Sequence, residues 1–166
     1  MGNIDDAYSL IIPSGVTPLF GNYFYDELIK TIESATLSIY SIQYQWKWNI
    51  HERFSKIQML GDAIRRARLR NVAVSVILNQ ESPRRHLSVI NRVSGDKLGE
   101  YGCLVKHLKA GTLLHTKLWV IDNRYSFIGS HNISTRSLTC NEEVSVKIDS
   151  VEVARLMIEY FNRLWG

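Results

Sequence analysis

Cysteine is scarce in this sequence, and its scarcity excludes two classes of small protein. The 166 residues hold only two cysteines, Cys103 and Cys140, and no Cys-x-x-Cys pair. A disulfide-rich scaffold and a cysteine-rich zinc module both need more thiols than this. We expect the two thiols to be inert, packed in the core or beside a site, rather than nucleophilic.

Long apolar runs are also missing. No stretch approaches the roughly 18 apolar residues that indicate a membrane-spanning helix. Residues 1–6 contain no basic segment followed by an apolar one, so no secretory signal is visible. The chain opens on Met1-Gly2, but Asp6 stands where a myristoylation signal has serine or threonine. The sequence therefore predicts a cytoplasmic protein without stable membrane association.

The charge balance is mildly basic rather than extreme. Twenty Lys and Arg residues against sixteen Asp and Glu give a formal net charge of +4. Hydrophobic residues make up 45% and charged residues 22%, as in ordinary globular proteins. We expect one domain over residues 1–166 with an irregular lead-in over 1–21. The basic excess favours a polyanionic partner if the positive charge surrounds a site.

Apolar residues recur with two periods along the chain. Helical spacing predicts helices over 22–34, 57–69, 83–100 and 151–164. Apolar or alternating runs predict strands over 36–44, 72–78, 103–108, 113–121, 125–128 and 143–148. This order predicts an α/β fold, in which a mixed β-sheet is flanked by helices in an α-β-α sandwich.

One stretch combines residue types that suit phosphate chemistry. It contains His115, Lys117, Asp122 and the segment 129–132 (GSHN), in the pattern H-x-K-x4-D-x6-G-S-x-N. At about 5% usage per residue type, these six fixed positions coincide by chance at fewer than roughly one start in ten million. The pattern is therefore a specific signal.

The chemistry of this stretch follows from its spacing. Alternation along a strand places His115 and Lys117 on one face. The ammonium can bind the non-bridging oxygens of a phosphodiester, while the imidazole attacks phosphorus or transfers a proton. Ser130 and Asn132 can hydrogen-bond the same oxygens, and Gly129 lets the backbone come close.

Two acidic residues have different expected roles. A histidine nucleophile must be neutral, so a carboxylate should hold its second N–H group. Glu143 is the candidate because it opens the strand over 143–148, and Glu142 is the second choice. Asp122 precedes Asn123 at a hairpin tip, where this dipeptide suits a turn.

The motif and the elements around it resemble the phospholipase D superfamily, in particular its small members with a single HKD motif, the Nuc-like endonucleases. The resemblance covers residues 18–166, from the helix and strand at 22–44 to the closing strand and helix. It implies a two-step displacement through a phosphohistidine that needs no metal and no cofactor. It also implies that Asp122 supports the structure and that Glu143, eleven positions after Asn132, is the family's acid.

The same resemblance implies a second histidine, which protonates the leaving oxygen and then activates water. This chain holds a single HKD motif. We therefore expect a two-fold homodimer with one composite site on its axis, since isologous dimers are the commonest oligomers.

Several further residues are candidates for substrate contact. Trp46, Lys47 and Trp48 alternate aromatic and basic character as single-strand binders do, although the tryptophans would equally suit a dimer interface. Arg84 and Arg85 follow a strand's carboxyl end, where α/β proteins place ligands.

Other polar residues carry less information. His131 stands between two motif positions, either at the entrance of the site or pointing away from it. The arginines of the basic helix predict a solvated face: Arg65, Arg66, Arg68 and Arg70. No metal site is expected, because His51, His86 and His107 show no metal-ligand spacing.

Three classes of function remain open. The first is a nuclease acting on DNA or RNA, with DNA favoured. The second is a lipid-directed phospholipase D or transphosphatidylase, whose members typically carry two motifs in a longer chain. The third is a non-catalytic nucleic-acid-binding module, against which the intact set of motif residues weighs. Single-motif size and basic charge favour the nuclease.

Overall fold

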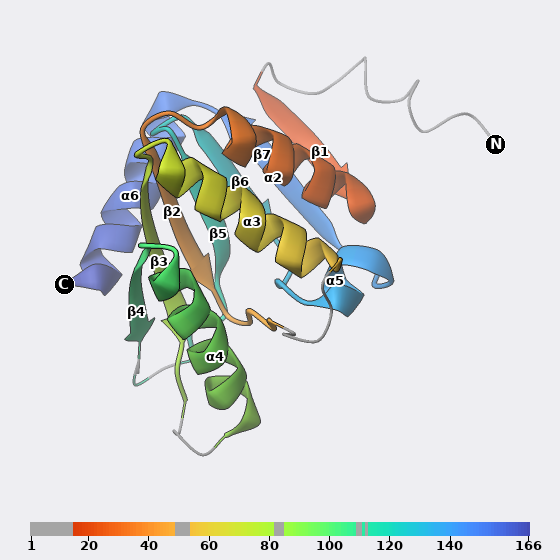
Figure 1. Ribbon diagram of the computed structural model, residues 1–166. Coiled ribbons are helices and arrows are strands. Elements are labelled where there is room, and N and C mark those ends of the chain that lie inside the picture. Colours follow the sequence, from red (N-terminus) through yellow and green to blue (C-terminus); the bar gives the residue numbers. More distant parts are fainter. Residues whose placement is uncertain (1–14, 49–53, 82–84, 109–110, 112) are drawn as a thin grey trace.

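Seven strands form one mixed sheet in the computed structural model (Figure 1). The structure describes residues 15–48, 54–81, 85–108, 111 and 113–166. The strand order across the sheet is β1-β7-β6-β5-β2-β3-β4. The strands are β1 Val16–Phe20, β2 Ser38–Gln43, β3 Ala73–Asn79, β4 Leu104–Leu108, β5 Lys117–Ile121, β6 Tyr125–Gly129 and β7 Val144–Asp149.

Helices cover both faces of the sheet (Figure 1). They are α2 Asn22–Ser34, α3 Lys56–Leu69, α4 His86–Glu100, α5 Thr135–Thr139 and α6 Val151–Trp165. Helices α2, α3 and α4 lie on one face, where α2 packs on α3 and α4 packs on β3 and β4. Helix α6 packs on the opposite face, against β2, β5 and β6. The predicted α-β-α sandwich is therefore confirmed.

Alternation along the central strands divides the core in two. Ile39 and Trp119 face α2 and α3 in the larger cluster. Ile42 and Leu118 belong to the second cluster, which the buried Phe161 of α6 completes. Each buried aliphatic or aromatic side chain contributes roughly 1.5–3 kcal/mol relative to full exposure, so both faces stabilise the central strands.

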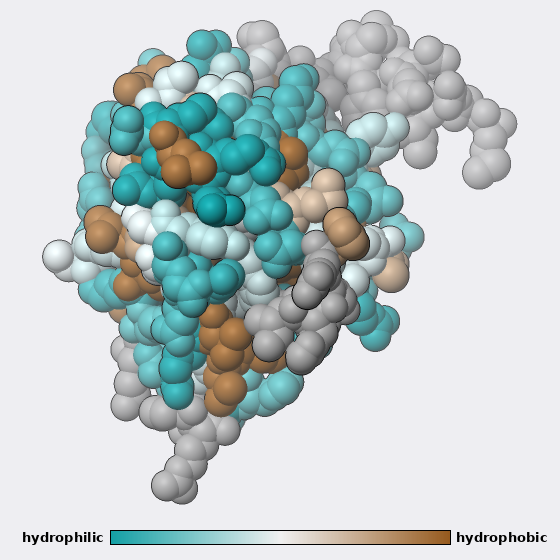
Figure 2. Space-filling model, viewed as in Figure 1, coloured by the Kyte–Doolittle hydropathy of each residue, from teal (hydrophilic) through white to brown (hydrophobic). Residues whose placement is uncertain are grey.

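The outer surface over α2 and α3 is largely hydrophilic, with separate apolar spots (Figure 2). Its arginines are more than a solvated face. Arg66 and Arg70 both pair with Glu33 of α2, and Arg68 donates a hydrogen bond to the carbonyl oxygen of Val72. These contacts link α3 to its neighbours. Within the described part of the chain, no helix is long and apolar enough to cross a membrane.

Strand direction brings several polar chain segments to one edge of the sheet. Strands β2, β3 and β4 are parallel to one another, and β5 runs antiparallel to β2, with Gln43 opposite Lys117. Strand β6 then pairs antiparallel with both β5 and β7. The carboxyl ends of β2 and β6 therefore meet the amino end of β5 at this edge.

Two elements were not predicted from the sequence, and the strand predicted over 113–121 begins only at Lys117. Residues 16–20 form edge strand β1, antiparallel to β7, instead of an irregular lead-in. Pro18 obscured this strand, because proline lacks the N–H of a ladder hydrogen bond and is tolerated at an edge. Between the predicted strands over 125–128 and 143–148, helix α5 begins after Ser134, whose Oγ accepts a hydrogen bond from the Ser137 N–H. One helical turn is too short to show a period.

The hairpin between β5 and β6 ends in a turn that is tied to β2. Asp122 and Asn123 have φ values of 53° and 56°, the left-handed conformation that both central residues of a type I′ turn require. The Asp122 carboxylate accepts hydrogen bonds of 2.8–3.2 Å from the backbone N–H groups of Thr36, Leu37 and Ser38. Burial raises the pKa of Asp122, but these hydrogen bonds outweigh burial and lower it overall.

We expect Asp122→Asn to lower the free energy of unfolding at pH 7 by about 1–3 kcal/mol, because an amide cannot accept every N–H that the carboxylate holds. The folded-state pKa lies below the unfolded value of about 3.9. The difference in the free energy of unfolding between wild type and variant is therefore largest above the unfolded-state pKa. It disappears as the pH falls through the folded-state pKa. Urea unfolding at several pH values measures it. The control is Asp26→Asn on the exposed side of α2, and an equal loss in both variants would contradict the assignment.

Candidate active site

His115 and Lys117 lie where the chain enters β5. The Nζ of Lys117 is 3.2 Å from each ring nitrogen of His115 and donates a 2.8 Å hydrogen bond to its carbonyl oxygen. Thr116 points the other way, with its Oγ1 3.3 Å from the hydroxyl oxygen of Tyr160 on α6. The strand alternation thus brings an imidazole and an ammonium to the same side.

The two side chains differ in exposure. His115 is exposed, whereas the side chain of Lys117 is buried. Burial lowers the pKa of Lys117, and the negative charge of Glu143 partly opposes this by raising it. The ammonium therefore stands in a confined position beside an accessible imidazole.

Tyr44 is a site neighbour that the sequence did not reveal. Its ring centroid lies 4.6 Å from that of His115, and Lys117 Nζ lies 5.2 Å from the tyrosine ring. The Tyr44 N–H donates a 3.0 Å hydrogen bond to the carbonyl oxygen of Thr116. This pairing brings Tyr44 beside the imidazole, and it depends on the register of β2 with β5, which the sequence pattern does not specify.

The segment after β6 carries the second half of the motif. At Gly129, an added Cβ would lie 2.1 Å from Ser145 Oγ and 2.4 Å from Ser145 Cα. Glycine is thus required by the close approach of β6 to β7 rather than by a ligand. The Asn132 N–H donates to Ser137 Oγ, while its side-chain Oδ1 is buried without a hydrogen-bond partner among the described residues. The amide oxygen therefore has an unused acceptor position inside the loop.

Glu143 organises this loop instead of contacting His115. Its carboxylate accepts a short hydrogen bond from Ser130 Oγ, one of 2.8 Å from Ser137 Oγ and one of 3.2 Å from Asn141 Nδ2. Burial raises the pKa of Glu143, but these hydrogen bonds lower it overall. Within the described part of one chain, no hydrogen bond joins Glu143 to His115, so the predicted carboxylate–imidazole contact is not formed there. Glu142, the second choice, is exposed.

The tryptophans predicted to contact substrate belong to the core. Trp46 is fully buried, 5.5 Å from Trp119 between ring centroids, and Trp48 is 7% exposed. The indole of Trp48 fills the space over Gly61 of α3, where a Cβ would lie 2.0 Å from its ring. Neither indole can stack on a nucleobase in this structure. Lys47, between them, is exposed.

His131 is also a structural residue. It is 1% exposed, stacks on Phe24 with ring centroids 4.2 Å apart, and has ring nitrogens 2.7 Å from Ser145 Oγ and 3.1 Å from the Gly21 carbonyl oxygen. Burial lowers its pKa, although the Gly21 hydrogen bond and the charge of Glu143 partly oppose this. The prediction that it contacts substrate is corrected, because the ring is buried and both of its nitrogens have partners within the chain.

The remaining candidates are spread over the surface or lie elsewhere. Arg85 is exposed and pairs with Glu81 at 3.2 Å, whereas Arg84 and His51 lie outside the described residues. Cys103 is buried, and burial raises the pKa of its thiol to about 11, as fits an inert side chain. No cluster of three or more His, Cys, Asp or Glu residues that could hold a metal occurs among the residues the structure describes.

The chain is similar in sequence to a curated protein of known name. The chain is 33% identical over 129 residues to cardiolipin synthase A of Proteus mirabilis, which covers 78% of this chain. It spans only about a quarter of that relative's length (26%).

Two solved structures share the fold. Nuc from Salmonella typhimurium, a phospholipase D family member, superposes with a TM-score of 0.75 at 19% identity, covering 90% of this chain and 93% of Nuc. NucT from Helicobacter pylori superposes with a TM-score of 0.69 at 22% identity, covering 90% of this chain and 94% of NucT. The family described as "Cardiolipin synthase, PLD-like domain" matches residues 28–165, and the chain therefore belongs to this phospholipase D-like family.

Proposed function

We propose that this chain is a metal-independent phosphodiesterase that hydrolyses nucleic acid, with DNA the favoured substrate. The observation that carries the proposal is the placement of the Lys117 ammonium 3.2 Å from both ring nitrogens of an exposed His115. An ammonium at this position can neutralise the non-bridging oxygens of a phosphodiester while the imidazole reaches phosphorus. The mild basic charge of the chain suits a polyanionic substrate.

The reaction proceeds in two displacements. A bare nitrogen of His115 attacks phosphorus, the bond to the leaving oxygen breaks, and a phosphohistidine forms. A second imidazole gives a proton to the leaving oxygen. That imidazole then takes a proton from water, which attacks phosphorus and releases His115. The side-chain amide N–H of Asn132 stabilises the negative oxygens, and Ser130 holds the Glu143 carboxylate in place beside them. Tyr44 orients the imidazole through its ring contact.

The second imidazole comes from another copy of the chain. The sequence has a single HKD motif, and a two-fold axis beside the exposed His115 would bring two copies of this imidazole together. A homodimer with one composite site is therefore part of the proposal.

Phosphatidyl transfer is the second candidate function. The sequence similarity to cardiolipin synthase A favours it, and the phosphohistidine chemistry would be the same with an alcohol in place of water. The two candidates differ in the phosphodiester that is attacked and in the acceptor, so activity measured on both substrate classes separates them.

His115→Ala is expected to reduce cleavage of plasmid or single-stranded DNA by at least about 10³-fold, because it removes the nucleophile. Wild-type cleavage should persist in excess EDTA. Agarose and denaturing gels measure nicking and strand cleavage, and His86→Ala, on the exposed surface of α4, is the matched control.

Release of headgroup from phosphatidylglycerol vesicles without DNA cleavage would instead select the lipid-directed activity. Salt-sensitive binding without turnover would select a binding module.

Mixing tests the composite site. If subunits exchange, excess His115→Ala protein should depress wild-type activity beyond simple dilution, because mixed dimers contain a single intact imidazole. Analytical ultracentrifugation of the same samples measures the mass. Full activity from a species of one-chain mass would refute the shared site.

Glu143→Gln is expected to move the alkaline limb of the kcat/KM profile to lower pH. The Lys117 ammonium is present below its pKa and lost as the pH rises through it. The negative charge of Glu143 raises that pKa, so its removal lets the pKa fall further. Glu159→Gln, on α6 across the sheet, should leave the limb in place. If the alkaline limb of the kcat/KM profile is the same in Glu143→Gln and wild type, this limb does not arise from deprotonation of Lys117.

A further inference from the structure

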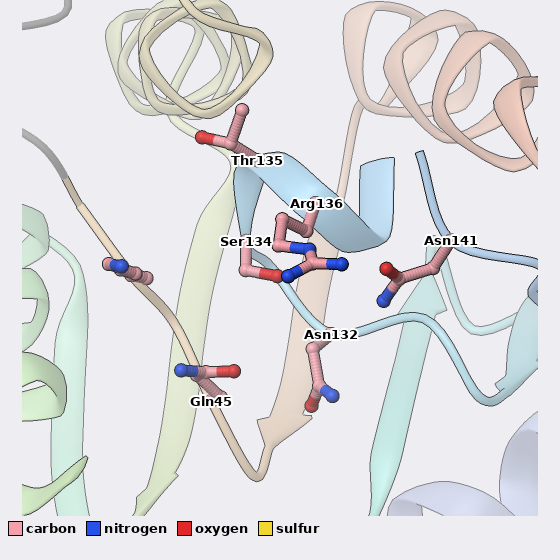
Figure 3. Close-up of a pocket in the computed structure, with 7 residues that line it drawn as sticks. Gln45, Asn132, Ser134, Thr135, Arg136 and Asn141 are labelled. Atoms are coloured by element: carbon pink, nitrogen blue, oxygen red, sulfur yellow. The ribbon is translucent and has the colours of Figure 1, made fainter. Parts of the chain in front are cut away.

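A polar pocket of about 460 Å³ adjoins the candidate active site at Asn132 (Figure 3). Two cations line it, Lys47 and Arg136, and no carboxylate is among its lining residues. Amide and hydroxyl groups complete the lining, among them Gln45, Asn132, Ser134 and Asn141. The composition is that of an anion site, since ammonium, guanidinium, amide and hydroxyl groups all supply hydrogen-bond donors.

One wall of the pocket is built from two extended segments that lie side by side. The Lys47 N–H donates to the Ile133 carbonyl oxygen at 2.7 Å, and the Ile133 N–H donates to the Gln45 carbonyl oxygen at 3.0 Å. Alternation then separates the side chains. Trp46 and Ile133 are fully buried in the core, whereas Lys47 and Gln45 on one segment and Asn132 on the other line the pocket.

Helix α4 holds this wall from behind. The side chain of Asn91 accepts a 2.9 Å hydrogen bond from the Trp46 N–H and donates one of 2.9 Å to the Tyr44 carbonyl oxygen. Ser94 Oγ accepts from the Trp48 N–H at 3.0 Å and donates to the Trp46 carbonyl oxygen at 2.6 Å. The backbone on both sides of Lys47 is thus fixed, so its placement in the pocket is preorganised.

The charges of the pocket are not neutralised within the described residues. Neither Lys47 nor Arg136 has a side-chain ion pair with any of them. The Arg136 guanidinium points into the space between Ser134, Asn141 and Asn132 (Figure 3). The neighbouring carboxylate of Glu143 is already bonded to the hydroxyl groups of the loop and to Asn141.

We propose that this pocket binds the phosphate next to the scissile one on a nucleic-acid strand, with Lys47 and Arg136 as its binding residues. The inference rests on the proposed nuclease activity and adds a substrate preference to it. Asn132 belongs to both sites, so an anion in the pocket lies adjacent to the reacting phosphate. A polynucleotide carries a further phosphate at every nucleotide, whereas a simple diester offers only one. The subsite therefore selects a strand over an isolated diester.

The test compares two substrates in one set of variants. With an oligothymidylate, Lys47→Ala and Arg136→Ala should each lower kcat/KM by about tenfold, as expected for the loss of one charged contact of about 1.4 kcal/mol. With bis(p-nitrophenyl) phosphate, which has one phosphate, both variants should match the wild type. Lys47→Arg should retain most of the oligonucleotide activity. Lys30→Ala on α2 and Arg155→Ala on α6, both exposed, are the charge-matched controls. Thermal melting checks that each variant folds.

A binding measurement separates this proposal from the proposed function. In the inactive His115→Ala background, the salt dependence of oligothymidylate binding should lose about 0.7 from its log–log slope when Lys47 or Arg136 is also replaced by alanine. If the slope falls in this way but the wild-type protein cleaves no nucleic acid, the phosphate-binding pocket is supported and the proposed nuclease function is overturned.

Three results would overturn the subsite. One is an equal loss of activity on both substrates. Another is no loss on the oligonucleotide. The third is a dependence on Lys47 and Arg136 that occurs with phosphatidylglycerol vesicles and not with oligonucleotides.

Discussion

The antiparallel pairing of β5 with β2 on one side and β6 on the other determines where the chemistry of this protein lies. Gln43 stands opposite Lys117, and Leu118 stands opposite Ile128, so both halves of the motif reach the same edge of the sheet. A one-residue slip would exchange the two faces of β5 and turn Lys117 toward α6. The buried residues on both faces oppose such a slip, because Trp119 and Leu118 would leave their respective clusters.

Within this frame, the loop after β6 is stiffened by one carboxylate. Glu143 gathers the hydroxyl groups of Ser130 and Ser137 and the amide of Asn141, and Ser137 in turn receives the N–H of Asn132. The same charge supports the ammonium of Lys117, whose burial opposes ionisation. One side chain therefore fixes the geometry of the loop and tunes the electrostatics of the site.

The sequence predicted those features that depend on local pattern. Helix α6 and strand β3 follow from periodicity because each buries a regular face, and the placement of His115 with Lys117 follows from strand alternation. Features that depend on three-dimensional contacts could not be predicted from the sequence. Composition alone could not separate a buried Trp46 from an exposed stacking ring, since both occur in the same aromatic and basic segment. Chain spacing identified Glu143 but not the groups that its carboxylate binds.

The hydrogen bonds from Asn91 and Ser94 tie the interior of α4 to the segment that presents Lys47. Both side chains are fully buried and contact no solvent. The position of Lys47 is thus governed partly by a buried turn of helix α4. Asn91 also bonds the Tyr44 carbonyl oxygen, and the Tyr44 ring lies beside His115. Packing changes beneath α4 would therefore reach both the segment of Lys47 and the surroundings of the imidazole.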